Sequence, residues 1–116
     1  MAKLSMQGKG KGEEITAFII EEMGRSGMTV ELIDSVTRQI GNATVYILVF
    51  EKYYMRSSNR ASLTVVVTAE NEDIIVDAIG AGGGQGVVFK WSWGAEESFV
   101  SSIENILAGK SFTRME

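Results

Sequence analysis

Residues 74–94 read IIVDAIGAGGGQGVVFKWSWG, and the arrangement of the remaining segments depends on how this stretch folds. It joins an apolar run, a glycine-rich segment and a second apolar run that carries both tryptophans. In the second run Val87, Phe89, Trp91 and Trp93 alternate with other residues, which is the two-residue period of a strand. The pattern therefore predicts strands over residues 74–79 and 87–93, joined by a loop and followed by a helix over 95–108.

The earlier segments alternate in ways that predict one helix and several strands. Apolar side chains recur at helical spacing over residues 13–23, and with a period of two over 28–40, 44–55 and 60–70. Residues 3–7 alternate more weakly and suggest a short first strand. Short turns between consecutive strands favour antiparallel pairing. We therefore predict an α+β fold, with an antiparallel sheet of five to six strands and both helices packed on one face.

The length of 116 residues is that of one domain, and no internal repeat or linker divides the chain. We predict a single domain over residues 1–116, with mobile ends over 1–12 and 111–116. The sequence begins without the apolar core of an export signal, and no apolar run is long enough to span a membrane. We therefore expect a cytoplasmic protein that does not bind membranes.

The composition excludes several chemistries. The chain has no cysteine and no histidine, which removes disulfides, thiolate catalysis and histidine-based acid–base catalysis. Its formal net charge is −4 and it has no basic run, so we expect no nucleic-acid partner. No catalytic pair stands out among the remaining residues. We expect a non-enzymatic ligand- or partner-binding module that uses no cofactor and no metal.

Two strands carry irregular patterns. Asp34 and Arg38 interrupt the apolar face of residues 28–40, so a bulge shifts the register there, the strand end leaves the core, or the two charges form a buried pair. Residues 45–50 are apolar on both faces, as in a strand covered on both sides or on one side plus a partner chain. The second pattern supports an alternative function, an interaction protein that forms a homodimer through its sheet face.

The glycine-rich segment is the main candidate for a ligand site. Five of residues 80–86 are glycine, which exposes backbone N–H groups that can cradle an anion or another small molecule. Gln85 and Val87 occupy positions where the GxGxxG motif requires glycine, so the phosphate motif is not present and a flexible connector is the alternative. The candidate ligand-binding residues are Gly82, Gly83, Gly84, Gln85, Arg60, Lys90 and Tyr53.

Other polar and aromatic groups have simpler interpretations. Arg60 could bind a carboxylate or phosphate within a cluster of charged, aromatic and amide groups at one end of two strands, or these residues pair across the strands and solvate a loop. The other members of the cluster are Glu51, Lys52, Tyr53, Tyr54, Arg56 and Asn59. The acidic residues Glu70, Glu72, Asp73 and Asp77 do not have the spacing of an EF-hand, which favours a solvated turn. Trp91 and Trp93 would line either the core or a ligand pocket.

Several short motifs resemble a small family of uncharacterised proteins from Gram-positive bacteria. The motifs are FEKY at 50–53, NRASL at 59–63, AIG at 78–80 with GGQ at 83–85, FK at 89–90 and GAEESF at 94–99. The resemblance covers about the last two-thirds of the chain. It implies an α+β domain and transfers no activity, ligand or catalytic residue.

Overall fold

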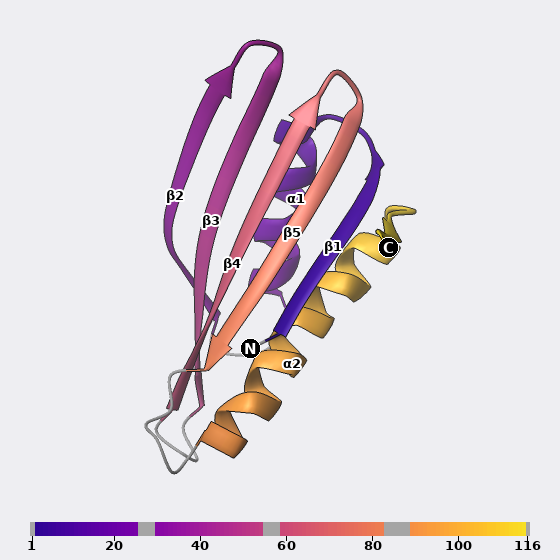
Figure 1. Cartoon of the computed structure of the whole chain (residues 1–116). Helices are drawn as coiled ribbons and strands as arrows, with labels where there is room; N and C mark the ends of the chain where they lie inside the picture. The colour runs from indigo at the N-terminus through magenta and orange to yellow at the C-terminus, as the bar shows by residue number, and fades with distance from the viewer. Residues whose placement is uncertain (1, 26–29, 55–58, 83–88, 116) are drawn as a thin grey trace.

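A six-stranded antiparallel sheet is the centre of the computed structural model, which describes residues 2–25, 30–54, 59–82 and 89–115 (Figure 1). The strand order is β2-β3-β4-β5-β1-β6, and all neighbouring strands are antiparallel. With two helices this is an α+β arrangement, as the sequence predicts. The elements are β1 (Ala2–Lys9), α1 (Gly12–Gly24), β2 (Val30–Ile40), β3 (Ala43–Tyr54), β4 (Asn59–Glu70), β5 (Asp73–Gly82), α2 (Phe89–Ala108) and β6 (Thr113–Arg114).

Two tight turns connect strands that are adjacent in sequence. Gly41 has a φ of +60° between β2 and β3, and Asn71 has a φ of +57° between β4 and β5. Two-residue hairpin turns need positive φ, which glycine and asparagine adopt at little cost. These turns form the hairpins between β2 and β3 and between β4 and β5.

The two ends of the chain lie side by side in the sheet. β1 pairs with β5 along its whole length, from Ala2 opposite Gly80 to Lys9 opposite Asp73. β6 then pairs with the other edge of β1, and Phe112 just before it is buried. The segments 1–12 and 111–116, expected to be mobile ends, therefore contain these two strands.

The predicted strand over residues 87–93 is wrong from Phe89 onward, because α2 begins there. A short apolar run fits the strand period and the helical period almost equally well, so tertiary structure decides between them. Here β5 already has β4 on one side and β1 on the other, which leaves no free edge of β5 for a following strand. Residues 87–88 and the side chains of 89–98, both tryptophans included, lie outside the described part of the chain.

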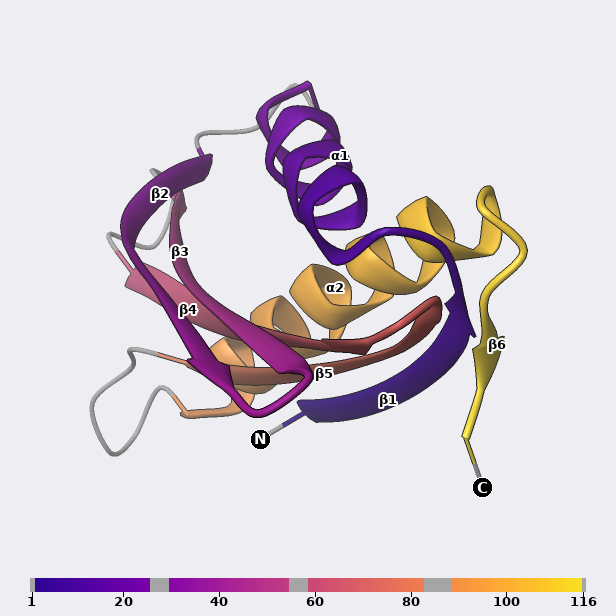
Figure 2. The ribbon, with the colours of Figure 1, turned by 90° about the horizontal axis from the view of Figure 1, so that it is seen from above.

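Both helices lie inside the curve of the sheet, and they contact each other (Figure 2). The buried stripe of α1 includes Ile15, Ile19 and Met23, and that of α2 includes Phe99, Ile103 and Leu107. These side chains form one core with alternate residues of the strands, namely Ala2, Leu4 and Met6 of β1, Leu48 and Phe50 of β3, Leu63, Val65 and Val67 of β4, and Ile74, Val76 and Ala78 of β5. The inner face of β1, β3, β4 and β5 is therefore covered by the helices, whereas that of β2 stays largely exposed.

The irregular pattern of residues 28–40 comes from a β-bulge. The pairing of β2 with β3 shifts between Leu32 and Asp34. Asp34 and Arg38 both stay exposed, so the alternative of a buried charge pair is wrong. The bulge lets Leu32 and Asp34 point to opposite faces of the sheet, since their partners on β3 are Phe50 and Val49.

Candidate interaction surface and polar sites

The side of the sheet that faces away from the helices is called here the outer face. It consists of the residues of β1 to β5 that alternate with the buried core positions. Figure 1 shows this face toward the viewer, with the helices behind the strands. Its apolar members are Val36, Val45, Ile47, Val49, Val66, Ile75 and Ile79.

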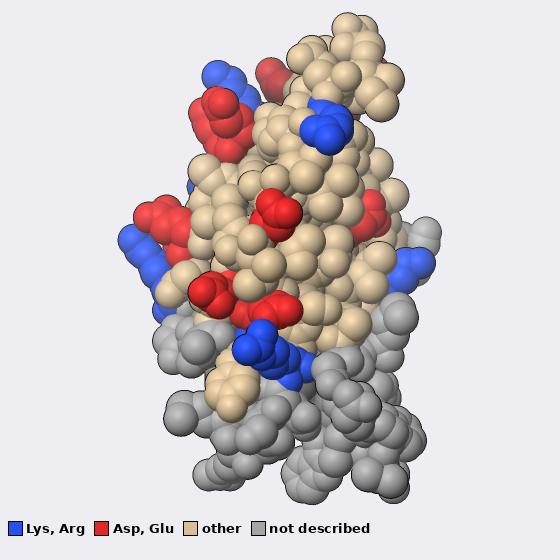
Figure 3. Space-filling model, turned by 90° about the vertical axis from the view of Figure 1, so that its left-hand side faces the viewer, with Lys and Arg blue, Asp and Glu red and all other residues tan. Residues whose placement is uncertain are grey.

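These outer-face side chains are only partly shielded by their neighbours. Ile75 and Ile79 are 37% and 39% exposed, whereas the alternating residues Ile74, Val76 and Ala78 are almost fully buried. The register places Ile75 opposite Thr68, and Ile79 opposite Thr64, so β-branched side chains adjoin across the strands. Figure 3 views the molecule from the side of β2 and shows uncharged surface with both acidic and basic groups on it.

One carboxylate lies in the middle of this apolar surface. Asp77 is half-buried and lies opposite Val66 on β4 and Ser5 on β1. The Ser5 hydroxyl donates a hydrogen bond to Oδ1 of Asp77 at 2.6 Å. A charge-assisted hydrogen bond of this kind satisfies one oxygen and leaves the other available.

Sequence reasoning found only part of the outer face. It identified the two-sided apolar pattern of residues 45–50 and missed the contribution of β5. The signal was present, because β5 places isoleucine at positions 75 and 79 as well as at 74, so both of its faces are apolar. Two-sided apolar character in neighbouring strands makes the outer face a candidate interaction surface.

Tyr53 and Arg60, two of the candidate ligand-binding residues, do come together. They lie opposite each other on β3 and β4, with the Arg60 guanidinium carbon 5.8 Å from the Tyr53 ring centroid. Nη1 of Arg60 also donates to Oε1 of Glu51 at 3.0 Å. A hollow of about 60 Å³ beside them is lined by Glu31, Glu51, Lys52, Tyr53 and Arg60. An anion at Arg60 must therefore compete with Glu51.

The other candidate residues are placed only in part. Gly82 ends β5 opposite Ala61, at the same end of the sheet as Arg60. Gly83, Gly84 and Gln85 lie outside the described residues. Lys90 belongs to the first turn of α2 instead of the predicted strand, and its side chain also lies outside the described part. The ligand site at the glycine-rich segment stays a prediction.

Lys52 is a buried lysine on the inner face. Its exposed fraction is 4%, and its Nζ lies 5.5 Å from the centroid of the Phe99 ring. Burial disfavours the charged ammonium and lowers the pKa of Lys52 below its usual value of 10.5. The aromatic face offsets part of this desolvation cost through a cation–π contact. The sequence grouped Lys52 with Arg60 in one polar cluster, whereas the two side chains lie on opposite faces of the sheet. Alternation alone does not show which lysine lies beneath a helix.

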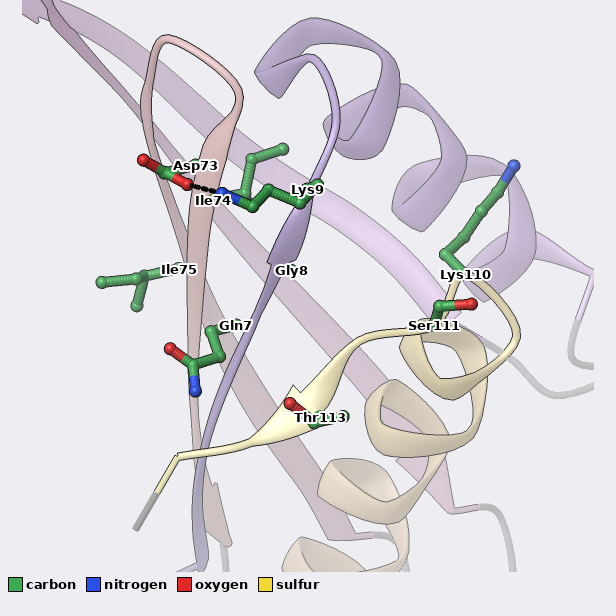
Figure 4. A pocket seen from close by; sticks show the side chains of 9 residues that line it. All are labelled: Gln7, Gly8, Lys9, Asp73, Ile74, Ile75, Lys110, Ser111 and Thr113. Atoms are coloured by element: carbon green, nitrogen blue, oxygen red, sulfur yellow. Dashed lines mark hydrogen bonds and ion pairs between the residues drawn. The ribbon is translucent and has the colours of Figure 1, made fainter.

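A larger hollow of about 450 Å³ lies between the β1–β5 pair and the C-terminal segment (Figure 4). Lys9 and Asp73 form an ion pair at one end, and both side chains are largely exposed. Lys110 lies with its Nζ 4.6 Å from the Phe18 ring centroid, on α1. The remaining lining residues are Gln7, Gly8, Ile74, Ile75, Ser111 and Thr113. These charged, polar and apolar side chains do not together favour one class of ligand.

No metal centre is present in the part of the chain that the structure describes. The described residues contain no group of three or more acidic side chains that could hold an ion. Glu70, Glu72 and Asp73 are exposed around the β4–β5 turn, while Asp77 lies on the outer face with Ser5. This arrangement agrees with the interpretation of the acidic residues as a solvated turn.

The fold and its surface define a small α+β domain whose antiparallel sheet has one open face. The sequence matches a family of unknown function, DUF6054, over residues 1–110, and the chain belongs to this family. The resemblance to an uncharacterised family is thereby confirmed. No characterised protein gives a significant match. Neither helix, within the described residues, has the length and apolar character needed to cross a membrane.

Proposed function

We propose that this protein is a non-enzymatic interaction protein that forms a homodimer through the outer face of its sheet. One observation carries the proposal. The nine central outer-face positions of β3, β4 and β5 hold eight uncharged β-branched residues and one aspartate, namely Val45, Ile47, Val49, Thr64, Val66, Thr68, Ile75, Asp77 and Ile79.

Such a surface is unusual for a strand face that stays in water. Antiparallel sheets with one solvated face normally alternate apolar inward and polar outward. Here β5 carries isoleucine on both faces, and β3 has valine and isoleucine on its outer face as well as leucine and phenylalanine on its inner face. Two sheets that pack face to face, with strands within about 30° of each other, bury side chains of this type.

The size of the surface suits a dimer that dissociates on dilution. Five strands about 4.8 Å apart, with outward residues about every 6.8 Å, give the outer face a projected area of about 800 Å². Standard interfaces bury about 800 Å² on each partner. The sheet curves away at β2 (Figure 2), so contact begins at the middle strands and uses less than the whole face. We therefore expect a dissociation constant on the order of micromolar.

The chemical groups of the chain support a non-enzymatic role. The chain has neither histidine nor cysteine. Arg60, the candidate anion-binding residue, already pairs with Glu51 and contacts Tyr53. The two groups nearest to a catalytic acid or base, Asp77 and Lys52, lie on opposite faces of the sheet and cannot act on one substrate together.

Sedimentation velocity over a concentration series tests the proposal. The wild type should approach twice the chain mass of 12.6 kDa at high concentration. Ile75→Glu places a charge in the outer face and should weaken the dimer at least tenfold, since burying an unpaired carboxylate is costly. Thr37→Glu is the matched control, because Thr37 is exposed on the inner face of β2, opposite Tyr46. A wild type that stays monomeric at hundreds of micromolar would overturn the proposal.

A further inference from the structure

The outer face is almost symmetric about its middle row. That row runs across the strands through Val36, Ile47, Val66, Asp77 and Ser5. On β3 the residues on either side of the row are both valine, on β4 both threonine and on β5 both isoleucine. The flanking pairs are Val45 and Val49, Thr68 and Thr64, and Ile75 and Ile79.

The edge strand β2 breaks this symmetry with opposite charges. Arg38 lies in one flanking row, opposite Val45, and Asp34 lies in the other, opposite Val49. The two residues are four apart on one strand, about 13 Å, so they cannot pair with each other within the chain. Arg38 donates to the backbone oxygen of Thr37, Asp34 accepts from the backbone N–H of Ser35, and both side chains stay exposed.

These two features fit a two-fold axis that runs along the middle row. Resting on the proposed function, we propose that the second copy docks with each strand antiparallel over its own counterpart. The axis exchanges the two flanking rows, so Val45 lies over Val49, Thr68 over Thr64 and Ile75 over Ile79 of the second copy. It also brings Arg38 of each copy to the same side as Asp34 of the other, as an isologous interface requires. Because the sheet curves away at β2 (Figure 2), these two opposite-charge pairs attract across a gap between the edge strands.

The competing arrangement has its axis parallel to the strands, with β2 over β1. Asp34 would then face Lys3 of the second copy, since both lie in the same row, and Arg38 would face Gln7. This arrangement places the apolar Ile47 over the carboxylate of Asp77 twice. The axis along the middle row places an uncharged β-branched residue over another at every central position of β3 and β4, and concentrates the unfavourable contact in one Asp77–Asp77 pair. The residue pattern therefore favours the axis along the middle row.

Charge exchange on β2 tests the orientation. The proteins compared by sedimentation at low salt are the wild type, Arg38→Glu, Asp34→Arg and the double exchange, with circular dichroism as the check of folding. Each single reversal replaces two attractions across this gap by two repulsions and should raise the dissociation constant several-fold at low salt. The double exchange restores both pairs and should return the dissociation constant to within about twofold of the wild type. Added salt should reduce all these differences.

Neutralising the residue on the axis gives a second measurement. Asp77→Asn removes the repulsion between two facing carboxylates and keeps a hydrogen-bonding partner for Ser5, so it should tighten the dimer several-fold. An unchanged dissociation constant in this variant would overturn the position of the axis.

The failures of the two proposals are distinguishable. Suppose that Ile75→Glu disrupts the dimer, that of the two single reversals only Asp34→Arg weakens it, and that the double exchange does not restore it. The orientation is then wrong, and the outer face is still the interface. The orientation is also wrong if Ile75→Glu disrupts the dimer while neither single reversal changes its dissociation constant. A dimer insensitive to Ile75→Glu instead contradicts the proposed function itself.

Discussion

Gly12, the first residue of α1, offers a sharp test of how closely this helix approaches the sheet. A Cβ atom at Gly12 would lie 2.7 Å from the Cβ of Ala69 and 2.8 Å from Cε1 of Tyr46. Carbon atoms prefer separations of about 3.5–4.0 Å, so Gly12→Ala must push the start of α1 away from β3 and β4. Overpacking of this kind costs about 1–3 kcal/mol.

The helix propensity of alanine acts in the opposite direction. Alanine is favoured over glycine by up to about 1 kcal/mol inside a helix, and by less at its first turn. We therefore expect Gly12→Ala to lower the free energy of unfolding by about 1–2 kcal/mol. For a chain of this length 1 kcal/mol corresponds to about 4 °C, so the midpoint should fall by about 4–8 °C.

Gly24→Ala, at the other end of the same helix, is the matched control. A Cβ at Gly24 would meet no atom within 4 Å, and its φ is not in the left-handed region. Its midpoint should equal or exceed that of the wild type. Thermal and urea unfolding followed by circular dichroism, at one protein concentration, measure both variants. If Gly12→Ala proves as stable as Gly24→Ala, the close packing of α1 on Tyr46 and Ala69 is wrong.

Three further predictions concern Lys52 and the C-terminal segment. The pKa of Lys52 is lower in the folded state, so the buried charge destabilises the fold fully below that pKa and no longer does so as the pH rises toward 10.5. Lys52→Met should therefore be more stable than the wild type at low pH and lose this advantage as the pH rises. If urea unfolding gives a stability difference that does not change with pH, the burial of a charged Lys52 is contradicted. Phe112→Ala should cost about 3–5 kcal/mol, since the ring is buried, whereas a mobile tail would cost almost nothing. Arg114 donates to both Glu104 oxygens at 2.7 and 2.8 Å and lowers the pKa of Glu104. The N–H of Met115, the next residue, donates to the backbone oxygen of Ser5 at 2.9 Å. Glu104→Gln should therefore speed exchange of the Met115 amide at neutral pH, and the wild type should approach the variant as acid protonates Glu104. Equal rates at neutral pH would count against the pairing.

The candidate site could be predicted only where it depends on neighbouring strands. The sequence places Tyr53 and Arg60 on consecutive strands joined by a short segment, so their meeting follows from antiparallel pairing. The burial of Lys52 could not be predicted, because it depends on Phe99, a residue of α2 that is distant in sequence.

The sequence by itself determined the local elements of this protein. Alternation specified β2 to β5 and the stripe of α1, and the charges at positions 34 and 38 left a bulge as one of three interpretations. Each of these features depends on contacts within a few residues, which the pattern of side chains encodes directly.

Only the tertiary structure decided the neighbours of β5 and the conformation of residues 89–93. The six strands include β6 near the C-terminus, and they do not include the predicted strand over residues 87–93 that would have carried both tryptophans. Residues 2–9 pair with residues 73–80, and occupy the edge that a strand after β5 would have used. Side-chain periodicity tells which face of a strand is buried, whereas the choice of its partner depends on competition between segments about seventy residues apart, which no local pattern records.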